Sequence, residues 1–544
     1  MARYLNSDAG RGYLLLLAIC LLLATEKVSF TRHAFGPLPD GGYYMNIAQH
    51  VRDGDGLVTD LSLAYKGAPY LPYPTDMYPL WPLLYGYLSR IFPLEATGHW
   101  LPAILYFTAI ACGYVWARGL VPRPLFPRVL PSFNAGHVLA IVLGLDSEFF
   151  RYTSYPYTEG LTYVLVFLAL WRFNRIWRRP SLRTGLELGA WLALTMLCRK
   201  QLFIMTLAAA TTLAGAVAFG RGQRRAWLVT AAAAAVAWVA LLLPHFLYVA
   251  SFTPNLGFGL YMRWDQLQHT KVLAPLPTLT EVPTLGAYLK DRFAGFKVAF
   301  GTGKMSYTNQ YYVFQYAILV ALPLVPLRLW QLRRELGPRL RELFAPASMH
   351  WVFIVVFALA GFFSIHTMHM HTEGSWEWAF AGRHALTSIF VIVLSLMLLL
   401  CSGSFPWTAA GVFLLCTGTY LGVVRVREWS VPAEDDTEPP PSPLVAWINE
   451  QRAGRDELVV ALRQPQYIAH LTPGVGYHWF HAKTTFKDVC AMTSQLGVDY
   501  VVAKGARFAS DPAFKAAFEL VDTVAAQRIY RPSPGGECAP PVPP

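Results

Sequence analysis

The chain has 544 residues, of which 54% are hydrophobic and only 14% are charged, and its formal net charge is +12. Soluble domains carry about 25% charged residues, so this composition argues against a soluble globular protein. The basic residues occur in short clusters between apolar segments, as they do in the cytoplasmic loops of membrane proteins. We therefore attribute the positive charge to membrane topology and expect no nucleic-acid partner.

Apolar segments recur between residues 13 and 424. Because a membrane-spanning helix needs about 20 apolar residues, we expect a polytopic α-helical membrane protein with about 11 transmembrane helices. The segments lie at 13–25, 103–116, 135–145, 157–170, 186–197, 202–219, 227–247, 312–327, 351–365, 386–400 and 406–424. The first could also be a signal peptide, but no convincing small-x-small cleavage site follows it.

The basic clusters predict the orientation of the chain. They lie near the N terminus and after the second, fourth, sixth and eighth apolar segments: Arg3, Arg11, Arg118, Arg123, Arg128, Arg172, Arg175, Arg178, Arg179, Arg183, Arg221, Arg224, Arg225, Arg328, Arg333, Arg334, Arg339 and Arg341. Short loops rich in Arg and Lys are cytoplasmic, so we expect a cytoplasmic N terminus and extracytoplasmic loops in between. Three of those outer loops, 26–98, 250–310 and 366–383, are long or unusual, as loops that carry function often are.

Asp40 lies in the first outer loop, directly after the first apolar segment. This position puts a carboxylate on the extracytoplasmic face, where a base can act on a substrate that approaches from outside. Farther along, residues 73–85 are rich in aromatic residues and proline. This stretch is typical either of a helix lying flat on the bilayer or of an aromatic belt.

The composition changes after Arg425. Residues 429–442 form a charged, proline-rich linker, and 443–544 are expected to fold as a small extracytoplasmic α/β domain after the transmembrane domain 1–428. We expect strands at 458–462 and 500–503 and helices at 444–451 and 486–496. Cys490 and Cys538 both lie in this segment, and a disulfide between them is one of two outcomes that the sequence allows in an oxidising compartment.

Several motifs resemble, in order, those of the GT-C glycosyltransferases, especially the protein mannosyltransferase and aminoarabinose transferase branch. They are Asp40 with Tyr44, residues 78–84, Glu159 within 155–161, Arg199 and Lys200 at the end of 194–200, Arg383 with His384, and the tail segments 496–502 and 528–530. Their order and their common placement outside make the combination more specific than any single motif. The resemblance covers nearly the whole chain.

The resemblance implies an inverting glycosyltransferase in a bacterial inner (plasma) membrane. It would move a hexose or pentose from a polyprenyl-phosphate donor to a lipid, protein or polysaccharide acceptor on the outer side. Asp40 would act as the general base. Glu159 would orient sugar or acceptor, although an ion pair with Arg151 explains it equally well, and Asp146 and Glu148 in the same loop could exchange roles with it.

The donor phosphate and sugar need cations and hydrogen-bonding groups at the outer ends of the spans. The candidates are Tyr44, Arg199, Lys200, Arg383, His384, His371 and Glu373. For any single cation the alternative is a side chain that only snorkels to the membrane interface. Basic residues are otherwise concentrated inside, so the outward pair of Arg199 and Lys200 is the more informative.

The run 366–373 contains three histidines and a carboxylate, which could bind zinc or manganese. Its alternate spacing suits an extended strand or loop equally well, so we expect no required metal cofactor. Other functions stay open. A polysaccharide polymerase or ligase is the nearest enzymatic alternative. A flippase or transporter is expected to show internal repeats, and none is visible. A scaffold protein would not need Asp40.

Overall fold

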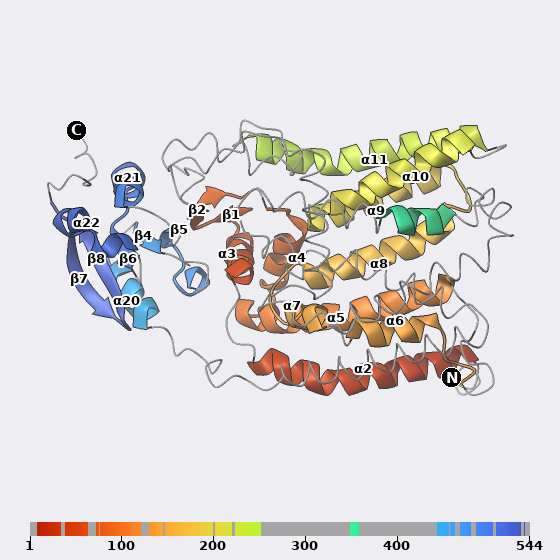
Figure 1. Cartoon of the computed structure of the whole chain (residues 1–544), viewed down its shortest axis with the longest axis horizontal. Helices are drawn as coiled ribbons and strands as arrows, with labels where there is room; N and C mark the ends of the chain where they lie inside the picture. The colour runs from red at the N-terminus through yellow and green to blue at the C-terminus, as the bar shows by residue number, and fades with distance from the viewer. Residues whose placement is uncertain are drawn as a thin grey trace, which may run out of the picture.

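The computed structural model describes residues 8–33, 39–63, 72–75, 77–120, 124, 130–144, 147–199, 202–219, 223–251, 349–357, 443–455, 457–462, 468–479, 486–503, 507–534 and 538. Long helices form a bundle along the longest axis of the molecule, and an α/β unit lies beyond one end of it (Figure 1). Two shorter helices and several short strands lie between these parts.

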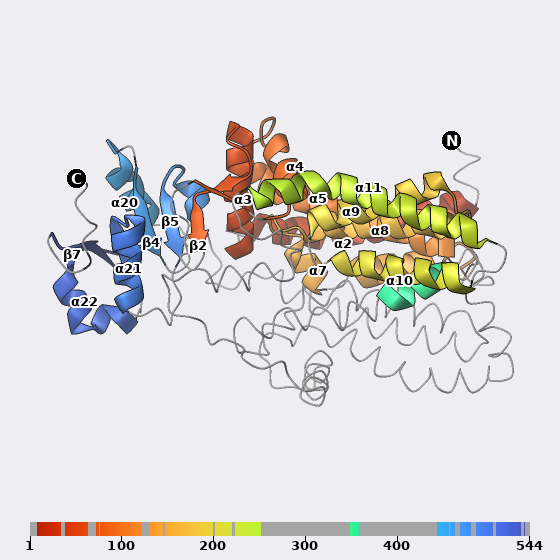
Figure 2. The ribbon, with the colours of Figure 1, turned by 90° about the horizontal axis from the view of Figure 1, so that it is seen from above.

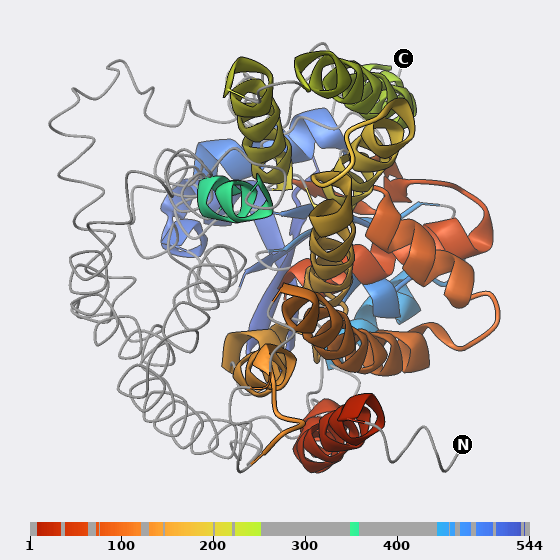
Figure 3. The same cartoon turned by 90° about the vertical axis from the view of Figure 1, so that its right-hand side faces the viewer.

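The bundle helices coincide with the apolar segments of the sequence. They are α2 (Asp8–His33), α5 (Leu94–Leu120), α6 (Ala135–Gly144), α8 (Glu159–Ile176), α9 (Leu182–Cys198), α10 (Phe203–Phe219) and α11 (Arg224–Ala250). Seen along the longest axis, these helices are nearly end-on (Figure 3). The predicted segments 312–327, 386–400 and 406–424 lie outside the described residues, and the described part of 351–365 is helical through residue 357.

Two of the described helices are long and apolar enough to cross a membrane, Leu94–Leu120 and Arg224–Ala250, and Phe203–Ala218 is a shorter apolar helix. The predicted number of about 11 spans is therefore not established. The bundle nevertheless exposes many large apolar side chains, as a lipid-facing surface does. They include Leu14, Leu17, Leu21, Leu22, Ile104, Leu186, Leu207, Leu228, Val236, Val239, Leu243 and Leu247.

The described basic clusters lie together at the end of the bundle away from the α/β unit. The guanidinium carbon of Arg118 lies 5.3 Å from the ring centre of Tyr13, which joins the end of α5 to the start of α2. Thr230 Oγ1 donates to Ser181 O at 3.2 Å, which joins the starts of α9 and α11. This arrangement is the one that alternating spans would produce. The side of the membrane on which each end lies stays a prediction.

Helices α9 and α11 pack closely because two glycines of α9 lie against the backbone of α11. A Cβ atom added to Gly189 would lie 2.1 Å from Ala234 O, and one added to Gly185 would lie 2.4 Å from Thr230 O. Small residues four positions apart allow such close approach in membrane bundles.

Helices α3 (Pro39–Asp53) and α4 (Leu80–Leu88) lie between the bundle and the α/β unit and run across the bundle axis (Figure 2). The segment expected to be a long outer loop thus contains two helices and is shorter than predicted, since α2 continues to His33 and α5 already begins at Leu94. The short strands β1 (Val58–Thr59) and β3 (Tyr73–Pro74) pair beside α3.

Some aromatic residues of α4 lie in the protein core and not in a membrane-facing belt. Trp81 and Tyr85 are fully buried in the bundle core. Trp81 Nε1 donates to Pro156 O at 3.1 Å, and Tyr85 Oη donates to Leu94 O at 2.9 Å. These two residues therefore hold α4 against the bundle.

The α/β unit contains a six-stranded sheet in the order β2-β5-β4-β6-β8-β7. The strands are β2 (Leu61–Leu63), β5 (Gly476–Trp479), β4 (Val459–Leu462), β6 (Tyr500–Ala503), β8 (Gln527–Pro532) and β7 (Phe518–Val524). The first four are parallel, and β8 and β7 are antiparallel additions. The helical elements are α20 (Pro443–Arg452), η5 (Ala469–Leu471), α21 (Phe486–Leu496), η6 (Arg507–Ser510) and α22 (Pro512–Ala517). Strands β4 and β6 and helices α20 and α21 lie where the sequence predicts them.

Strand β2 comes from the N-terminal part of the chain. Leu61 pairs with Tyr477, and Tyr477 N also donates to Asp60 O at 2.8 Å. The sheet of the α/β unit is therefore completed by the segment that follows α3. The proposed domain boundaries stay predictions.

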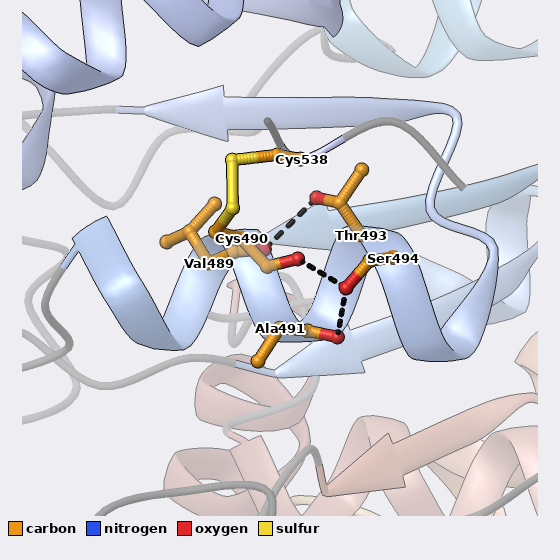
Figure 4. The surroundings of a disulfide bond; sticks show 6 residues. All are labelled: Val489, Cys490, Ala491, Thr493, Ser494 and Cys538. Atoms are coloured by element: carbon orange, nitrogen blue, oxygen red, sulfur yellow. Dashed lines mark hydrogen bonds between the residues drawn. A yellow bond between two sulfur atoms is a disulfide. The ribbon is translucent and has the colours of Figure 1, made fainter. Parts of the chain in front are cut away.

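A disulfide links Cys490 in α21 to Cys538 near the C terminus, with their Cα atoms 4.7 Å apart (Figure 4). The sequence left this pairing open, and the structure shows that the two cysteines are bonded. Of the cysteines in the described bundle helices, Cys20, Cys112 and Cys198 are free thiols.

Candidate functional site

Two predicted site residues form a buried ion pair at the end of the bundle that faces the α/β unit. Glu159 is the first residue of α8, and Arg199 directly follows the last residue of α9. Arg199 Nη1 donates to Glu159 Oε1 at 2.6 Å, with side-chain exposures of 12% and 3%. We call this end of the bundle, where α8 begins and α9 ends, the site end.

The chain brings these two residues together because α8 and α9 are consecutive antiparallel helices. The turn between them begins α9 with a capping box in which Ser181 and Thr184 satisfy each other's backbone N–H groups. A carboxylate at the start of a helix also faces the positive end of the helix dipole. Thr158 Oγ1 donates a long hydrogen bond, 3.4 Å, to the other carboxylate oxygen.

Glu159 was expected either to orient sugar or acceptor or to form a structural ion pair, and the pairing decides between these two roles only in part. The sequence offered Arg151 as the structural partner, whereas the structure pairs Glu159 with Arg199. An arginine at the site end needs an anionic partner, and the carboxylate supplies one. A guanidinium has five N–H donors, so the same arginine can hold a carboxylate and a phosphate together.

Asp40 lies in the first turn of α3, and its side chain is outside the described part of the chain. Helix α3 packs on α4, and α4 reaches the segment before Glu159 through the Trp81–Pro156 hydrogen bond. Tyr44, on the same helix, is partly buried against the bundle core. The predicted base and the ion pair thus belong to elements that meet at the site end.

A buried polar network on α3 was not predicted from the sequence. Asn46 Nδ2 donates to Asp60 Oδ2 at 3.0 Å, and Asn46 Oδ1 accepts from Thr59 Oγ1 at 2.8 Å. His50 lies between two carboxylates, with Nε2 3.0 Å from Asp60 Oδ2 and Nδ1 2.9 Å from Asp55 Oδ2. The network fixes α3 to the segment that enters the sheet.

The carboxylates around His50 determine its charge. Burial lowers the pKa of His50, but hydrogen bonds and charge attraction from Asp60 and then Asp55 outweigh burial and raise the pKa above its ordinary value. The spacing of residues 46 and 50 on one helix face was visible in the sequence. Their partners were not, because Asp55 and Asp60 lie beyond a turn.

Lys27 was also missed, because the predicted first span ended at residue 25. It lies on the last turns of α2 and is fully buried. Its ammonium nitrogen donates to Phe150 O, Thr153 Oγ1 and Ser154 Oγ at 2.5, 2.9 and 2.6 Å. These acceptors lie at the end of α7 (Ser147–Tyr152) and in the turn that follows it.

Known structures share this architecture. The apo oligosaccharyltransferase of Archaeoglobus fulgidus matches with a TM-score of 0.55 and 12% identity, over 90% of this chain and 69% of that one. ArnT from Cupriavidus metallidurans bound to undecaprenyl phosphate matches with a TM-score of 0.54 and 11% identity, over 97% and 99%. This chain has the GT-C fold.

A further solved structure has a similar fold. AglB from Archaeoglobus fulgidus, in complex with an inhibitory peptide and a dolichol-phosphate, matches with a TM-score of 0.54, 13% identity and coverage of 90% and 69%. No family model matches the chain, and no curated protein matches it in sequence. The GT-C fold and the exposed apolar faces of α2 and α11 support a membrane location.

The remaining predicted site residues of this GT-C fold are not described. Lys200, Arg383, His384, His371 and Glu373 lie outside the described residues, as does the histidine run 366–373. One Archaeoglobus fulgidus oligosaccharyltransferase structure is a complex with zinc and sulfate. Among the residues that the structure of this chain describes, no group of three His, Cys, Asp or Glu side chains fits a metal ion. The expectation that no metal is required stays a prediction.

Proposed function

We propose that this chain is an integral-membrane glycosyltransferase that moves a sugar from a polyprenyl-phosphate donor to an acceptor on the extracytoplasmic side. The observation that carries the proposal is the buried Glu159–Arg199 pair at the site end of a GT-C fold. Both residues belong to the motifs by which the sequence resembles this class, and they meet across two consecutive helices although they lie 40 positions apart.

The donor class follows from the chemistry at the site end and from the relatives. ArnT and AglB have been solved with undecaprenyl phosphate and dolichol-phosphate. In this chain, Arg199 is anchored by Glu159 and keeps part of its side chain accessible. A fixed guanidinium near a membrane surface suits a lipid phosphate, because it stabilises the charge that develops when the phosphate leaves.

The reaction is a single inverting displacement. The acceptor hydroxyl oxygen attacks the anomeric carbon, the bond from that carbon to the phosphate oxygen breaks, and the polyprenyl phosphate leaves with the bonding electrons. Asp40 takes the hydroxyl proton, and the anionic phosphate stays beside Arg199. No covalent enzyme intermediate is needed, so one carboxylate suffices as the base.

The remaining candidates complete the donor site. Lys200, Arg383 and His384 would hold the phosphate, and Tyr44, His371 and Glu373 would bind the sugar or the phosphate by hydrogen bonds. A bacterial inner membrane with the N terminus inside and the α/β unit outside would put this site next to lipid, protein or polysaccharide acceptors. The choice between hexose and pentose donors belongs to the loops around the site.

The test uses purified protein in nanodiscs with a panel of polyprenyl-phosphate sugars and a native lipid extract as acceptor source. We expect release of free polyprenyl phosphate from at least one donor, and loss of that release in Arg199→Gln at a temperature at which thermal unfolding shows this variant to be still folded. Arg90→Gln is the matched control, because Arg90 is exposed and bonds the backbone of α3 instead of Glu159. Donor that stays intact with every acceptor would contradict the proposal, and its movement across the bilayer of proteoliposomes that contain the protein would indicate a flippase.

A further inference from the structure

Lys27 is an unusual cation, because its three described hydrogen-bond acceptors carry no negative charge. They are one backbone carbonyl and two hydroxyls. An ammonium has three N–H donors, and these acceptors satisfy all of them. The nitrogen also lies 4.5 Å from the ring centre of Tyr106 and 4.6 Å from that of Phe150, within range of cation–π attraction.

Burying an ammonium costs free energy, and the packing of this region does not require a charged side chain. Transfer of a charged group out of water costs far more than transfer of an apolar group of the same size. A methionine would fill a similar volume without that cost. The function of Lys27 must therefore lie in its contacts: the ammonium holds Phe150 and Ser154 in place.

The ammonium holds the start of the segment that leads to Glu159. The two hydroxyls that accept from Lys27 also donate to the end of α7, since Thr153 Oγ1 bonds Phe149 O and Ser154 Oγ bonds Phe150 O. Lys27 is thus the centre of a cap that closes α7. The next residues run directly to the start of α8 at Glu159.

Three elements fix this segment at three points. Lys27 of α2 holds residues 150–154, Trp81 of α4 holds Pro156, and Arg199 of α9 holds Glu159. The position of Glu159 therefore depends on the cap as well as on its own ion pair. We infer that Lys27 is a positioning residue, which fixes the turn between α7 and α8 so that Glu159 meets Arg199. The effect of this positioning on sugar transfer rests on the proposed function.

The first test does not depend on catalysis. Amide hydrogen exchange of residues 153–162 is compared in wild type, Lys27→Met and the control Thr25→Val, which changes an exposed residue of the same helix. Because three hydrogen bonds to a charged group are lost, we expect exchange in this segment to accelerate about tenfold or more in Lys27→Met alone. Unchanged exchange there, or equal acceleration along α2 and α5, would overturn the inference.

The second test separates positioning from general stability. Lys27→Met is expected to lower kcat about tenfold in the wild-type background and to have little further effect in a Glu159→Gln background, because residues that act through one another are not additive. Equal losses in both backgrounds would show a purely structural role. If wild type transfers no sugar, the proposed function fails while the exchange result still stands. Should Lys27→Met not fold, Ser154→Ala removes one acceptor and should loosen the same segment.

Discussion

At the scale of single residues, Glu159 and Arg199 each explain why the other is tolerated. A carboxylate that is 3% exposed at the start of a bundle helix is costly without a cation, and an arginine at the site end is costly without an anion. Because their charges satisfy each other, both can stay close to a reacting phosphate. Substitutions in this pair are therefore the best test of how the site is held together.

Arg199→Gln should destabilise the protein by about 3–5 kcal/mol, because it leaves Glu159 charged and buried without its partner. The double variant Glu159→Gln with Arg199→Gln should recover most of this loss, since two amides can hydrogen-bond to each other. Thermal unfolding of wild type and both variants in the same nanodiscs measures the difference. Equal melting temperatures for the single and the double variant would show that the pair is not coupled.

His50 should make stability depend on pH. The pKa of His50 is raised in the folded protein, so the folded state binds its proton more tightly than the unfolded chain does. The stabilisation is therefore complete below the ordinary value of about 6.5 and is lost as the pH rises through the folded pKa. Melting temperatures of wild type and His50→Gln, measured from acidic to alkaline pH, should converge as the pH increases. Parallel curves would exclude His50 as the titrating group.

The sequence singles out charged residues as candidates, but it does not show what they contact. Glu159, Arg199 and Asp40 stand out because they lie at the predicted outer ends of apolar segments, whereas the basic clusters are concentrated on the predicted inner side. The Glu159–Arg199 pairing needs the packing of α8 against α9, which a motif does not contain. Lys27 was missed for a different reason: a lysine just past an apolar run is normally a solvated flank, and only the extension of α2 to His33 buries it.

At the scale of elements, the contact of α9 with α11 shows how the bundle is held together. In lipid, apolar side chains gain little by leaving the solvent, so helices associate through close packing. Gly185 and Gly189 give α9 a smooth face against the backbone of α11. The position of Arg199, at the end of α9, depends on this contact.

Gly189→Ala should destabilise the bundle by about 1–3 kcal/mol, because the new methyl group would lie 2.1 Å from Ala234 O and the helices must move apart. Gly119→Ala is the matched control, since a Cβ there meets no atom within 4 Å. Melting temperatures of the two variants should differ clearly in the same detergent. A control that melts as early as Gly189→Ala would mean that the close approach is not the cause.

Bundle helices were located by their apolar runs even where the run is short, as for α6, whereas α3, which has no such run, was not. The apolar runs located α5, α9 and α11, whereas the first outer loop proved to contain α3 and α4. The aromatic residues of α4 misled the prediction in part, because burial in a protein core and exposure to lipid require the same apolar side chains. Trp81 and Tyr85 belong to the core.

At the scale of the whole molecule, the N-terminal part of the chain and the C-terminal segment share one sheet. Strand β2 pairs with β5 over Leu61 to Leu63, directly after the network that fixes α3. The α/β unit is thus connected to the helix that carries Asp40 by more than the linker. No sequence pattern predicts this pairing, because a three-residue strand has no distinctive period and its partner is very distant in the chain.

The disulfide should matter for the α/β unit. It closes a loop between residues 48 positions apart, for which loop-closure entropy predicts a stabilisation of about 2–4 kcal/mol. Replacing Cys490 and Cys538 by serine should therefore lower the unfolding temperature of this unit, while the bundle helices melt as before. Proteolysis during heating follows the two parts separately. Simultaneous earlier melting of both would show that the parts unfold as one.

The most direct test of the account compares sugar transfer by wild type, Asp40→Asn and the control Asp53→Asn in nanodiscs. Asp53 is on the same helix, is half exposed and pairs with Arg52 away from the ion pair. If Asp40 is the base, its variant should lose about a hundred- to ten-thousand-fold in kcat with an unchanged melting temperature, and the control should keep its activity. Equal transfer by wild type and Asp40→Asn would contradict the proposed mechanism.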